Sequence, residues 1–209
     1  MSNAGTSSTF QLVAGHAVLD LVNTLDWRFR ETGPEELLKE YDDLLRFAEQ
    51  SGMLSLRQAR HLLRTINGRS GARVRQSAIE LRETLAQIFY EILEQRSPSA
   101  TLLKTLQAFF ETARSHRKLR WNQSTLGWSW AGSEDEPALP LWILSTAADD
   151  LITSETMHRL RACNNPECRW LFLDTSKNHT RRWCNMKVCG NRMKARRFQA
   201  RSALSQAPQ

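Results

Sequence analysis

The sequence predicts a mainly α-helical protein made of a large N-terminal domain and a small C-terminal module. Three observations support this division. Apolar residues recur at helical spacing through most of the first 150 residues. All four cysteines lie after residue 160. The charge changes at the same place, because residues 1–156 carry 17 Lys and Arg against 20 acidic residues, whereas residues 157–209 carry 12 against 2. We therefore divide the chain into residues 1–156 and 157–209.

The N-terminal domain is predicted to contain several amphipathic helices. Five apolar stripes run over residues 37–48, 56–66, 74–92, 102–113 and 141–152. Glycine and proline residues separate most of them. Ser55 is followed three residues later by Gln58, which resembles a capping box at the start of the second helix. A domain of about 150 residues is large enough to bury its own core.

A β-hairpin is predicted between the fourth and fifth stripes. Leu119 and Trp121, and then Leu126, Trp128 and Trp130, alternate with polar residues on either side of residues 122–125. Together with the nearby Trp142, these tryptophans could line a ligand pocket. The favoured alternative is that they hold the hairpin and the core together.

Composition and local motifs exclude several classes of protein. The chain is 41% hydrophobic and 24% charged, which is typical of a globular protein. No apolar run approaches the roughly 18 residues that a membrane-spanning helix needs, and residues 1–5 do not resemble a secretory signal. We therefore expect a cytoplasmic protein that does not bind membranes.

We do not expect an enzyme. The sequence contains no glycine-rich phosphate-binding loop and no serine nucleophile elbow. His16 lies four residues before Asp20, so both would share one face of a helix. No nucleophile accompanies this pair, and a structural or capping role is favoured over acid–base catalysis.

The four cysteines form two pairs of equal spacing. Four residues separate Cys163 from Cys168, four separate Cys184 from Cys189, and 15 lie between the pairs. In a chain without a secretory signal, this pattern indicates a four-thiolate zinc site, with disulfides or free thiols as the alternatives. Four protein ligands leave no open coordination position, so the ion would be structural. It would also stabilise a segment of roughly 50 residues that has few core residues.

The residues around the cysteines predict a two-stranded ribbon followed by a helix. Residues 160–163 and 170–173 can pair as short strands, and a helix is expected over residues 191–201. Ala195 and Phe198 of this helix are expected to pack on the ribbon. The C-terminal module is thus predicted to be a zinc ribbon or treble-clef-like unit that ends in a basic helix.

The positive charge of this module indicates a polyanionic partner. Lys194, Arg197 and Arg201 recur on one side of the expected helix. Cations held rigidly at this density are typical of nucleic-acid binding, and a solvated cationic surface is the alternative. Asn191 or Arg192 could read a base edge. The candidate contacts are Arg181, Arg182, Lys187, Asn191, Arg192, Lys194, Arg196, Arg197 and Arg201.

The C-terminal module resembles the CGNR zinc finger. The resemblance is carried by CNNPECRWLFLDTS at 163–176, RRWC at 181–184 and CGNRMKARR at 189–197. The family takes its name from the tetrapeptide found here at residues 189–192. The resemblance implies zinc ligation by Cys163, Cys168, Cys184 and Cys189.

The N-terminal domain is similar to the ABATE domain that accompanies this finger. The matching segments are LDLVNTL at 19–25, LLRFA at 44–48 and GML at 52–54, although Leu21 stands where an aromatic residue is commoner. Proteins of this type are described as stress-induced transcription regulators of bacteria. Asp20, Asn23 and Thr24 lie in the first segment. We expect them to bond to backbone groups, with ligand sensing as the alternative.

The sequence therefore predicts a DNA-binding transcription regulator. The zinc module would contact duplex DNA, while the N-terminal domain would sense an unidentified small-molecule effector or mediate assembly, for example as a homodimer on a palindromic site. One alternative is an RNA-binding protein in which exposed Trp170 or Trp183 stacks on unpaired bases. Another is a small-molecule sensor or enzyme in which the finger is purely structural.

Overall fold

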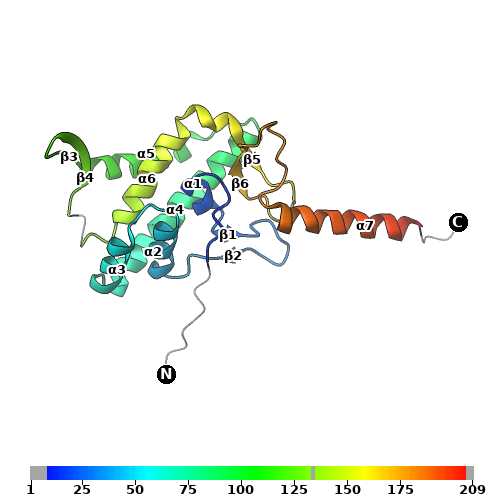
Figure 1. Ribbon diagram of the computed structural model, residues 1–209, viewed down its shortest axis with the longest axis horizontal. Helices are drawn as coiled ribbons and strands as arrows, with labels where there is room; N and C mark the ends of the chain where they lie inside the picture. Colours follow the sequence, from blue (N-terminus) through cyan, green and yellow to red (C-terminus); the bar gives the residue numbers. More distant parts are fainter. Residues whose placement is uncertain (1–8, 133–134, 206–209) are drawn as a thin grey trace, which may run out of the picture.

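The computed structural model describes residues 9–132 and 135–205, and it confirms a mainly helical fold (Figure 1). Within the last helix, the side chains of Arg201 and of residues 203–205 lie outside the described part. The N-terminal elements in chain order are α1 (Ala17–Val22), β1 (Leu25–Asp26), β2 (Glu35–Glu36), α2 (Tyr41–Gln50), α3 (Leu56–Thr65), α4 (Gly68–Leu93), α5 (Ala100–Ser115), β3 (Arg117–Asn122), β4 (Thr125–Trp130) and α6 (Leu139–Ile152). The C-terminal elements are the 3-10 helix η1 (Glu155–Arg159), β5 (Leu160–Ala162), β6 (Leu171–Leu173), the π-helical turn η2 (Met186–Gly190) and α7 (Asn191–Ser205).

Helix α4 forms the centre of the N-terminal domain. It packs against α1, α2, α5 and α6, and its apolar stripe is buried. Leu81, Leu85 and Phe89 have no exposed surface. This stripe matches the periodicity of the sequence, because residues that recur every three to four positions fall on one face of a helix.

Local capping decides where α2 and α3 begin. The predicted capping box at α3 forms, since Gln58 N donates to Ser55 Oγ at 3.3 Å and Ser55 N donates to Gln58 Oε1 at 3.0 Å. The apolar stripe of residues 37–48 starts four residues before the helix that carries it. Helix α2 starts only at Tyr41, because the Asp43 carboxylate accepts from the backbone N–H of Glu40 and fixes the start there.

The predicted hairpin forms and projects from one end of the molecule (Figure 1). Strands β3 and β4 pair antiparallel in a register that sets Leu119 opposite Trp128 and Trp121 opposite Leu126. At its base, the Trp130 ring stacks near the buried Trp142 with 6.1 Å between ring centroids. The hairpin is thus anchored at its base, while its outer part stays exposed.

The C-terminal ribbon shares one core with the helical domain. Strands β5 and β6 pair as predicted, with Leu160 opposite Leu173. Phe172 on β6 and Leu19 on α1 are both fully buried and belong to the same apolar cluster. Helix α1 contacts β6 as well as α4 and α6. The zinc module is therefore packed onto the N-terminal domain.

Asn23, at the end of α1, supplies a polar connection between the two parts. Its Nδ2 donates to the Leu171 carbonyl at 2.9 Å, and its Oδ1 accepts from the Leu171 N–H at 2.9 Å. Two residues along β6, the N–H of Leu173 donates to the Ala14 carbonyl at 2.8 Å. The outer edge of the ribbon is thus satisfied by groups of the N-terminal domain.

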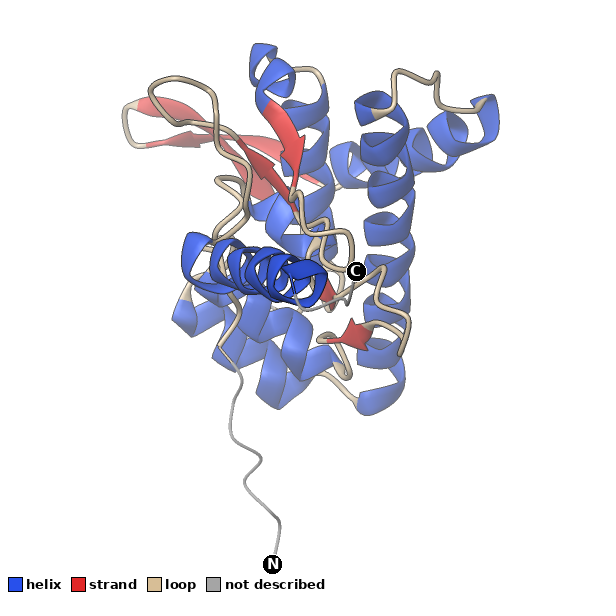
Figure 2. Cartoon of the chain, turned by 90° about the vertical axis from the view of Figure 1, so that its right-hand side faces the viewer, coloured by secondary structure: helices blue, strands red, loops and turns tan. Residues whose placement is uncertain are grey.

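Helix α7 leaves the body of the protein and projects away from it (Figure 1); Figure 2 views it nearly along its axis. The prediction that Ala195 and Phe198 pack on the ribbon is wrong. Ala195 is exposed, and the Phe198 side chain is 72% exposed. The π-helical turn η2 directs α7 outward, and two apolar side chains on a strongly basic helix are too few to bring it back onto the ribbon.

Among the described residues, no helix is long and apolar enough to cross a bilayer.

Replacing Asn23 by Ala should destabilise the whole protein. The variant leaves the buried N–H and C=O of Leu171 without their side-chain partner, which should lower the free energy of unfolding by about 2–4 kcal/mol. Denaturant unfolding followed by circular dichroism measures this. The matched control is Asn122→Ala on the exposed hairpin, which should change stability by less than about 0.5 kcal/mol. Equal effects of the two variants would contradict a connecting role for Asn23.

Candidate metal centre and basic surface

The structure brings the four cysteines together in one buried cluster. Their sulfur atoms all lie within 4.8 Å of one another, and all four residues are buried. The Sγ atom of Cys184 lies 3.7 Å from that of Cys168 and 3.7 Å from that of Cys189. A zinc ion with four Zn–S bonds of about 2.3 Å has sulfurs about 3.8 Å apart, whereas a disulfide bond is about 2.05 Å long. The donor set and its spacing therefore fit a tetrahedral zinc ion, and the cysteines are free thiols.

The backbone of the ribbon positions the first two ligands. The Cys163 N–H donates to the Trp170 carbonyl at 2.8 Å, and the Cys168 N–H donates to the Asn165 carbonyl at 3.1 Å. The Asn165 side chain is fully buried, and its Nδ2 lies 3.6 Å from Cys189 Sγ. An N–H donor of this kind stabilises a thiolate. Sequence reasoning missed Asn165, although its place between the first two cysteines was a signal.

The electrostatics of the cluster call for a cation. Hydrogen bonds from the other three cysteines hold the pKa of Cys163 well below that of an ordinary thiol, and the one from Cys168 has the largest effect. The contact with Cys163 has the opposite effect on Cys168 and Cys184, and it raises the pKa of both thiols. Several like charges cannot be accommodated so close together without compensation. A divalent ion would allow all four sulfurs to be thiolates.

Each residue of the Cys189–Arg192 tetrapeptide has a separate structural task. Cys189 belongs to the sulfur cluster. A Cβ atom on Gly190 would lie 2.4 Å from Met186 Sδ, so any larger residue at this position would displace the Met186 side chain. Asn191 Nδ2 donates to the Lys187 carbonyl at 3.1 Å. The Arg192 guanidinium lies 4.2 Å from the centre of a Trp27 ring, in a cation–π contact with the N-terminal domain.

Besides Asn191 and Arg192, two more of the predicted nucleic-acid contacts are engaged within the protein. Arg181 Nη2 donates to the Val13 carbonyl at 2.9 Å and to the Cys184 carbonyl at 2.6 Å, and its guanidinium lies over the Phe172 ring. Arg181 is half-buried, and its side chain ties the metal loop to the N-terminal segment, so its role as a nucleic-acid contact stays a prediction. Arg196 forms an ion pair with Glu167 at 2.6 Å.

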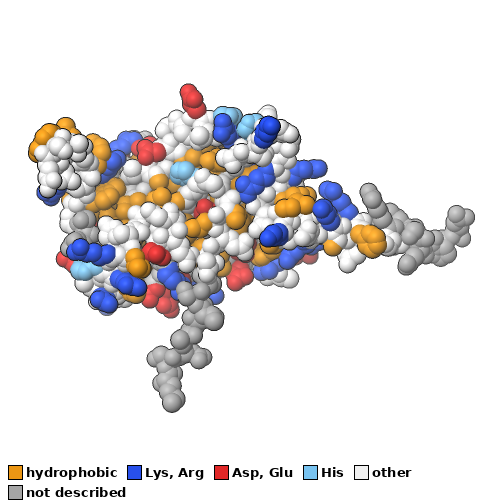
Figure 3. Space-filling view, in the orientation of Figure 1, with side chains coloured by type: hydrophobic (Ala, Val, Ile, Leu, Met, Phe, Trp, Pro, Cys, Tyr) orange, Lys and Arg blue, Asp and Glu red, His pale blue; other side chains and the backbone are white. Residues whose placement is uncertain are grey.

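The other predicted cations lie on the surface. The described residues Arg182, Lys187, Lys194 and Arg197 are exposed, and no ion pair connects them to an acidic side chain in the described part of the chain. Arg201 lies in α7, but its side chain falls outside the described residues. Residues 175–209 contain nine Lys and Arg and no acidic residue. Figure 3 shows blue side chains gathered around the base of α7.

Trp170 is not available to stack on a nucleic-acid base. It is 7% exposed, which contradicts the expectation of an exposed ring. Its position on the ribbon turns it toward the cavity beside the sulfur cluster, which Asp26 and Trp27 also line. Trp183 is half-buried. Of the aromatic rings between the first and last cysteine, only the partly covered Trp183 could therefore stack on a base, whereas Phe198 on α7 is exposed.

Asp20 binds the segment that precedes α1. Its Oδ1 accepts from the N–H groups of Val13 and Ala14, both at 3.0 Å. Burial raises the pKa of Asp20 to about 6, although these two hydrogen bonds oppose the shift. His16 does not pair with Asp20. It caps α1 instead, since its Nδ1 accepts from the Val18 N–H at 3.3 Å.

Thr24 also has partners inside the protein. Its hydroxyl donates to the Leu21 carbonyl at 2.7 Å and accepts from Arg82 Nη1 at 3.2 Å. Arg82 is 2% exposed and forms two hydrogen bonds of 2.7 Å with the Glu36 carboxylate. Asp20, Asn23 and Thr24 thus all bond to groups of the protein. Sequence reasoning missed the buried Arg82, because an arginine in an amphipathic helix is ordinarily exposed.

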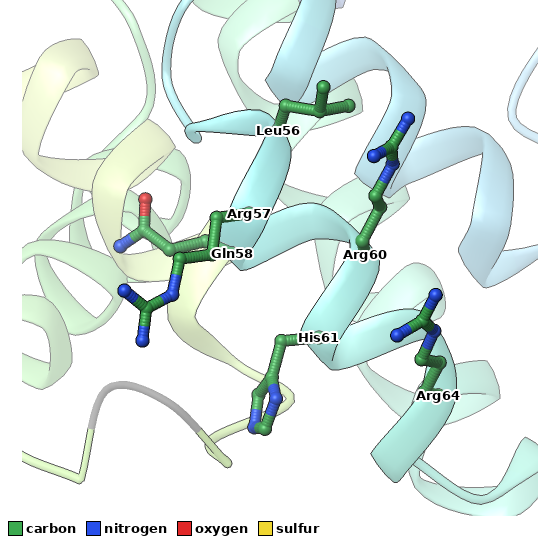
Figure 4. Close-up of a pocket in the computed structure, with 6 residues that line it drawn as sticks. All are labelled: Leu56, Arg57, Gln58, Arg60, His61 and Arg64. Atoms are coloured by element: carbon green, nitrogen blue, oxygen red, sulfur yellow. The ribbon is translucent and has the colours of Figure 1, made fainter.

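A separate hollow lies on α3, away from the cysteines (Figure 4). Arg57, Arg60 and Arg64 line it together with His61. Figure 4 shows Arg57 on one side of α3 and Arg60 and Arg64 on the other, so the guanidinium groups do not converge on one point. His61 points toward the loop between β4 and α6, where its Nε2 lies 2.8 Å from Asp135 Oδ1. This arrangement does not resemble a binding site for one anion.

The family can now be assigned. A family model described as "Putative stress-induced transcription regulator", the ABATE domain, matches residues 15–155, and the CGNR zinc finger model matches residues 159–202. The chain belongs to the ABATE family and carries a CGNR zinc finger. No curated protein matches its sequence. By this description the family is one of transcription regulators, and the sulfur cluster lies within the matched finger.

We expect one zinc ion per chain, bound by the four cysteines. Cys168→Ser removes one ligand and should abolish stoichiometric zinc binding. Since structural zinc contributes several kcal/mol or more, the melting temperature should fall by more than about 10 °C. Metal analysis and thermal unfolding measure these effects. Val188→Ser, an exposed position between two ligands, is the matched control and should retain zinc. A structural zinc site would be contradicted if the purified wild-type protein contained no metal and were as stable as protein to which zinc has been added.

Asp20 should make stability depend on pH. Because its folded-state pKa is raised, the folded chain holds this proton more tightly than the unfolded chain, and stability falls as pH rises through about 4 to 6. Asp20→Asn retains an acceptor oxygen but cannot ionise. Relative to wild type, this variant should gain about 1 kcal/mol of stability between pH 5 and pH 7.5. Denaturant unfolding at both pH values measures the gain. A stability difference independent of pH would contradict the buried ionisation.

Proposed function

We propose that this protein is a regulator that binds duplex DNA through its zinc module and helix α7. The observation that carries the proposal is the projecting basic helix. Helix α7 has 15 residues and is therefore about 22 Å long. It lies in a segment with nine cations and no acidic residue. A helix of about 10–12 Å diameter fits the major groove of B-DNA, which is about 12 Å wide.

The proposed metal has a structural task. Zinc held by the four cysteines would neutralise their charge and fix the two loops from which η2 and α7 start. Four protein ligands leave no position for a reacting water, so we propose that the chain acts by binding and not by catalysis. A binding role is also supported by helix α7, which is basic and projects away from the body of the protein.

The individual cations are assigned different tasks. Lys194 and Arg197 on α7, with Arg182 and Lys187 on the metal loops, would contact phosphates and supply affinity without sequence preference. Asn191 and Arg192 bond to a backbone carbonyl and to Trp27, respectively. We therefore assign these two residues to positioning α7 and not to reading bases.

The N-terminal domain would then position the finger, and it would sense an effector or mediate assembly. Arg192 and Arg181 both contact this domain from the finger. A conformational change at α1 or Trp27 would therefore alter the position of the base of α7. We favour DNA over RNA because Trp170 is buried and cannot stack on a base.

The double variant Lys194→Ala/Arg197→Ala should weaken DNA binding. For about six phosphate contacts, log affinity falls against log salt with a slope of about −5, and loss of two contacts should reduce its magnitude by about 2. Fluorescence anisotropy with a labelled duplex at several salt concentrations measures the slope.

The matched control for this variant is Arg60→Ala/Arg64→Ala, which removes two cations from α3. It should leave affinity and slope unchanged. Equal effects of the two double variants would mean that net charge alone drives binding, which contradicts a specific role for α7. Stronger binding to single-stranded RNA than to duplex DNA would favour the RNA-binding alternative.

A further inference from the structure

One face of the β3–β4 hairpin is an exposed apolar surface. Side chains directly opposite each other in an antiparallel pair share one face. This register places Leu119, Trp121, Leu126 and Trp128 together. They are 55%, 68%, 63% and 62% exposed, respectively. Figure 3 shows this apolar group at the protruding end of the molecule.

Exposed apolar side chains in such a group need an explanation. Single exposed leucines are common on proteins, but a contiguous apolar patch of a few hundred Å² marks an interaction site. The two tryptophans alone present on the order of 300 Å². Their exposure also means that they are not seated in a groove of their own chain.

A groove of matching chemistry lies beside the base of the hairpin, between α4, α5 and α6. Its volume is about 510 Å³, it is open to solvent, and its lining includes Ala108, Phe109, Leu141 and Trp142. Trp142 also stacks with Trp130 of β4, so the apolar surface continues from the groove onto the hairpin. Nothing in the described part of the chain fills this groove.

The charges of the hairpin and of the domain are complementary. Residues 117–130 contain three cations and no acidic residue, whereas the remainder of residues 1–156 contains 14 cations and 20 acidic residues, a net charge of −6. The groove itself is lined by one acidic residue, Glu80, and one cation, Lys104, so the complementarity is that of the whole domain. A basic apolar hairpin is therefore suited to the groove of a second acidic domain of the same kind.

We propose that two copies of this chain form a dimer in which each hairpin inserts into the α4–α5–α6 groove of the other copy. Each chain offers one hairpin and one groove, so the exchange closes on two copies with two-fold symmetry. Two hairpins and two grooves together reach the roughly 1,000 Å² of buried surface that a stable interface requires. Because α7 lies at the opposite end of the molecule (Figure 1), the contact leaves both basic helices free.

This inference deepens the assembly role proposed for the N-terminal domain. It is tested without nucleic acid, so its failure is distinct from a failure of DNA binding. Sedimentation equilibrium of zinc-loaded wild-type protein at tens of micromolar should give twice the 24.1 kDa mass of one chain. Trp121→Ser/Trp128→Ser should raise the dimer Kd at least about 30-fold, because both side chains would lie at the centre of the interface.

A second variant tests the groove without touching the hairpin. Ala108 is exposed on α5 and lines the groove, so Ala108→Arg should fill it and raise the dimer Kd by a similar factor. The matched control is Phe198→Ser, which removes an equally exposed apolar side chain from α7 and should leave the dimer intact. Circular dichroism and zinc content verify that each variant is folded.

Three outcomes would overturn the proposal. A monomeric wild-type protein would mean that the hairpin serves some other partner. A double tryptophan variant that remains folded and dimeric would exclude the hairpin from the interface. An intact dimer of Ala108→Arg would exclude the groove.

Discussion

The crowding of four buried sulfurs is the constraint on which the C-terminal module of this protein depends. Sulfur atoms of buried residues within 4.8 Å of one another favour a divalent cation that balances their charge. The ribbon strands have three residues each and could not hold this arrangement by pairing alone. The metal site and the strands therefore stabilise each other.

The finger is not a separate unit attached to a helical domain. Phe172 is buried in the same core as α1, and Asn23 completes the hydrogen bonding of the ribbon edge at Leu171. Arg181 passes from the metal loop to Val13. A disturbance at the metal site would thus reach α1, and a disturbance of α1 would reach the base of α7. This continuity is the physical basis on which an N-terminal domain could influence a C-terminal DNA contact.

The two surfaces that we assign to partners have opposite chemistry and lie at opposite ends of the molecule (Figure 1). Helix α7 is basic and nearly devoid of buried side chains, so binding to a polyanion would supply the contacts that its own chain does not. The hairpin presents tryptophan and leucine, whose burial against a second apolar surface is favourable. The separation allows both contacts to form at once.

The sequence by itself determined the elements and the metal ligands, because these depend on local spacing. Helical periodicity identified α2 to α6, alternation identified the hairpin, and two equally spaced cysteine pairs identified the sulfur cluster. The tertiary structure decided which side chains remain available. Trp170 reads as a surface residue in the sequence but is buried, Arg181 is half-buried and bonded to Val13, and Phe198 was expected to pack but is exposed. Burial depends on contacts between residues far apart in the chain, such as Arg181 with Val13, and local pattern carries no information about them.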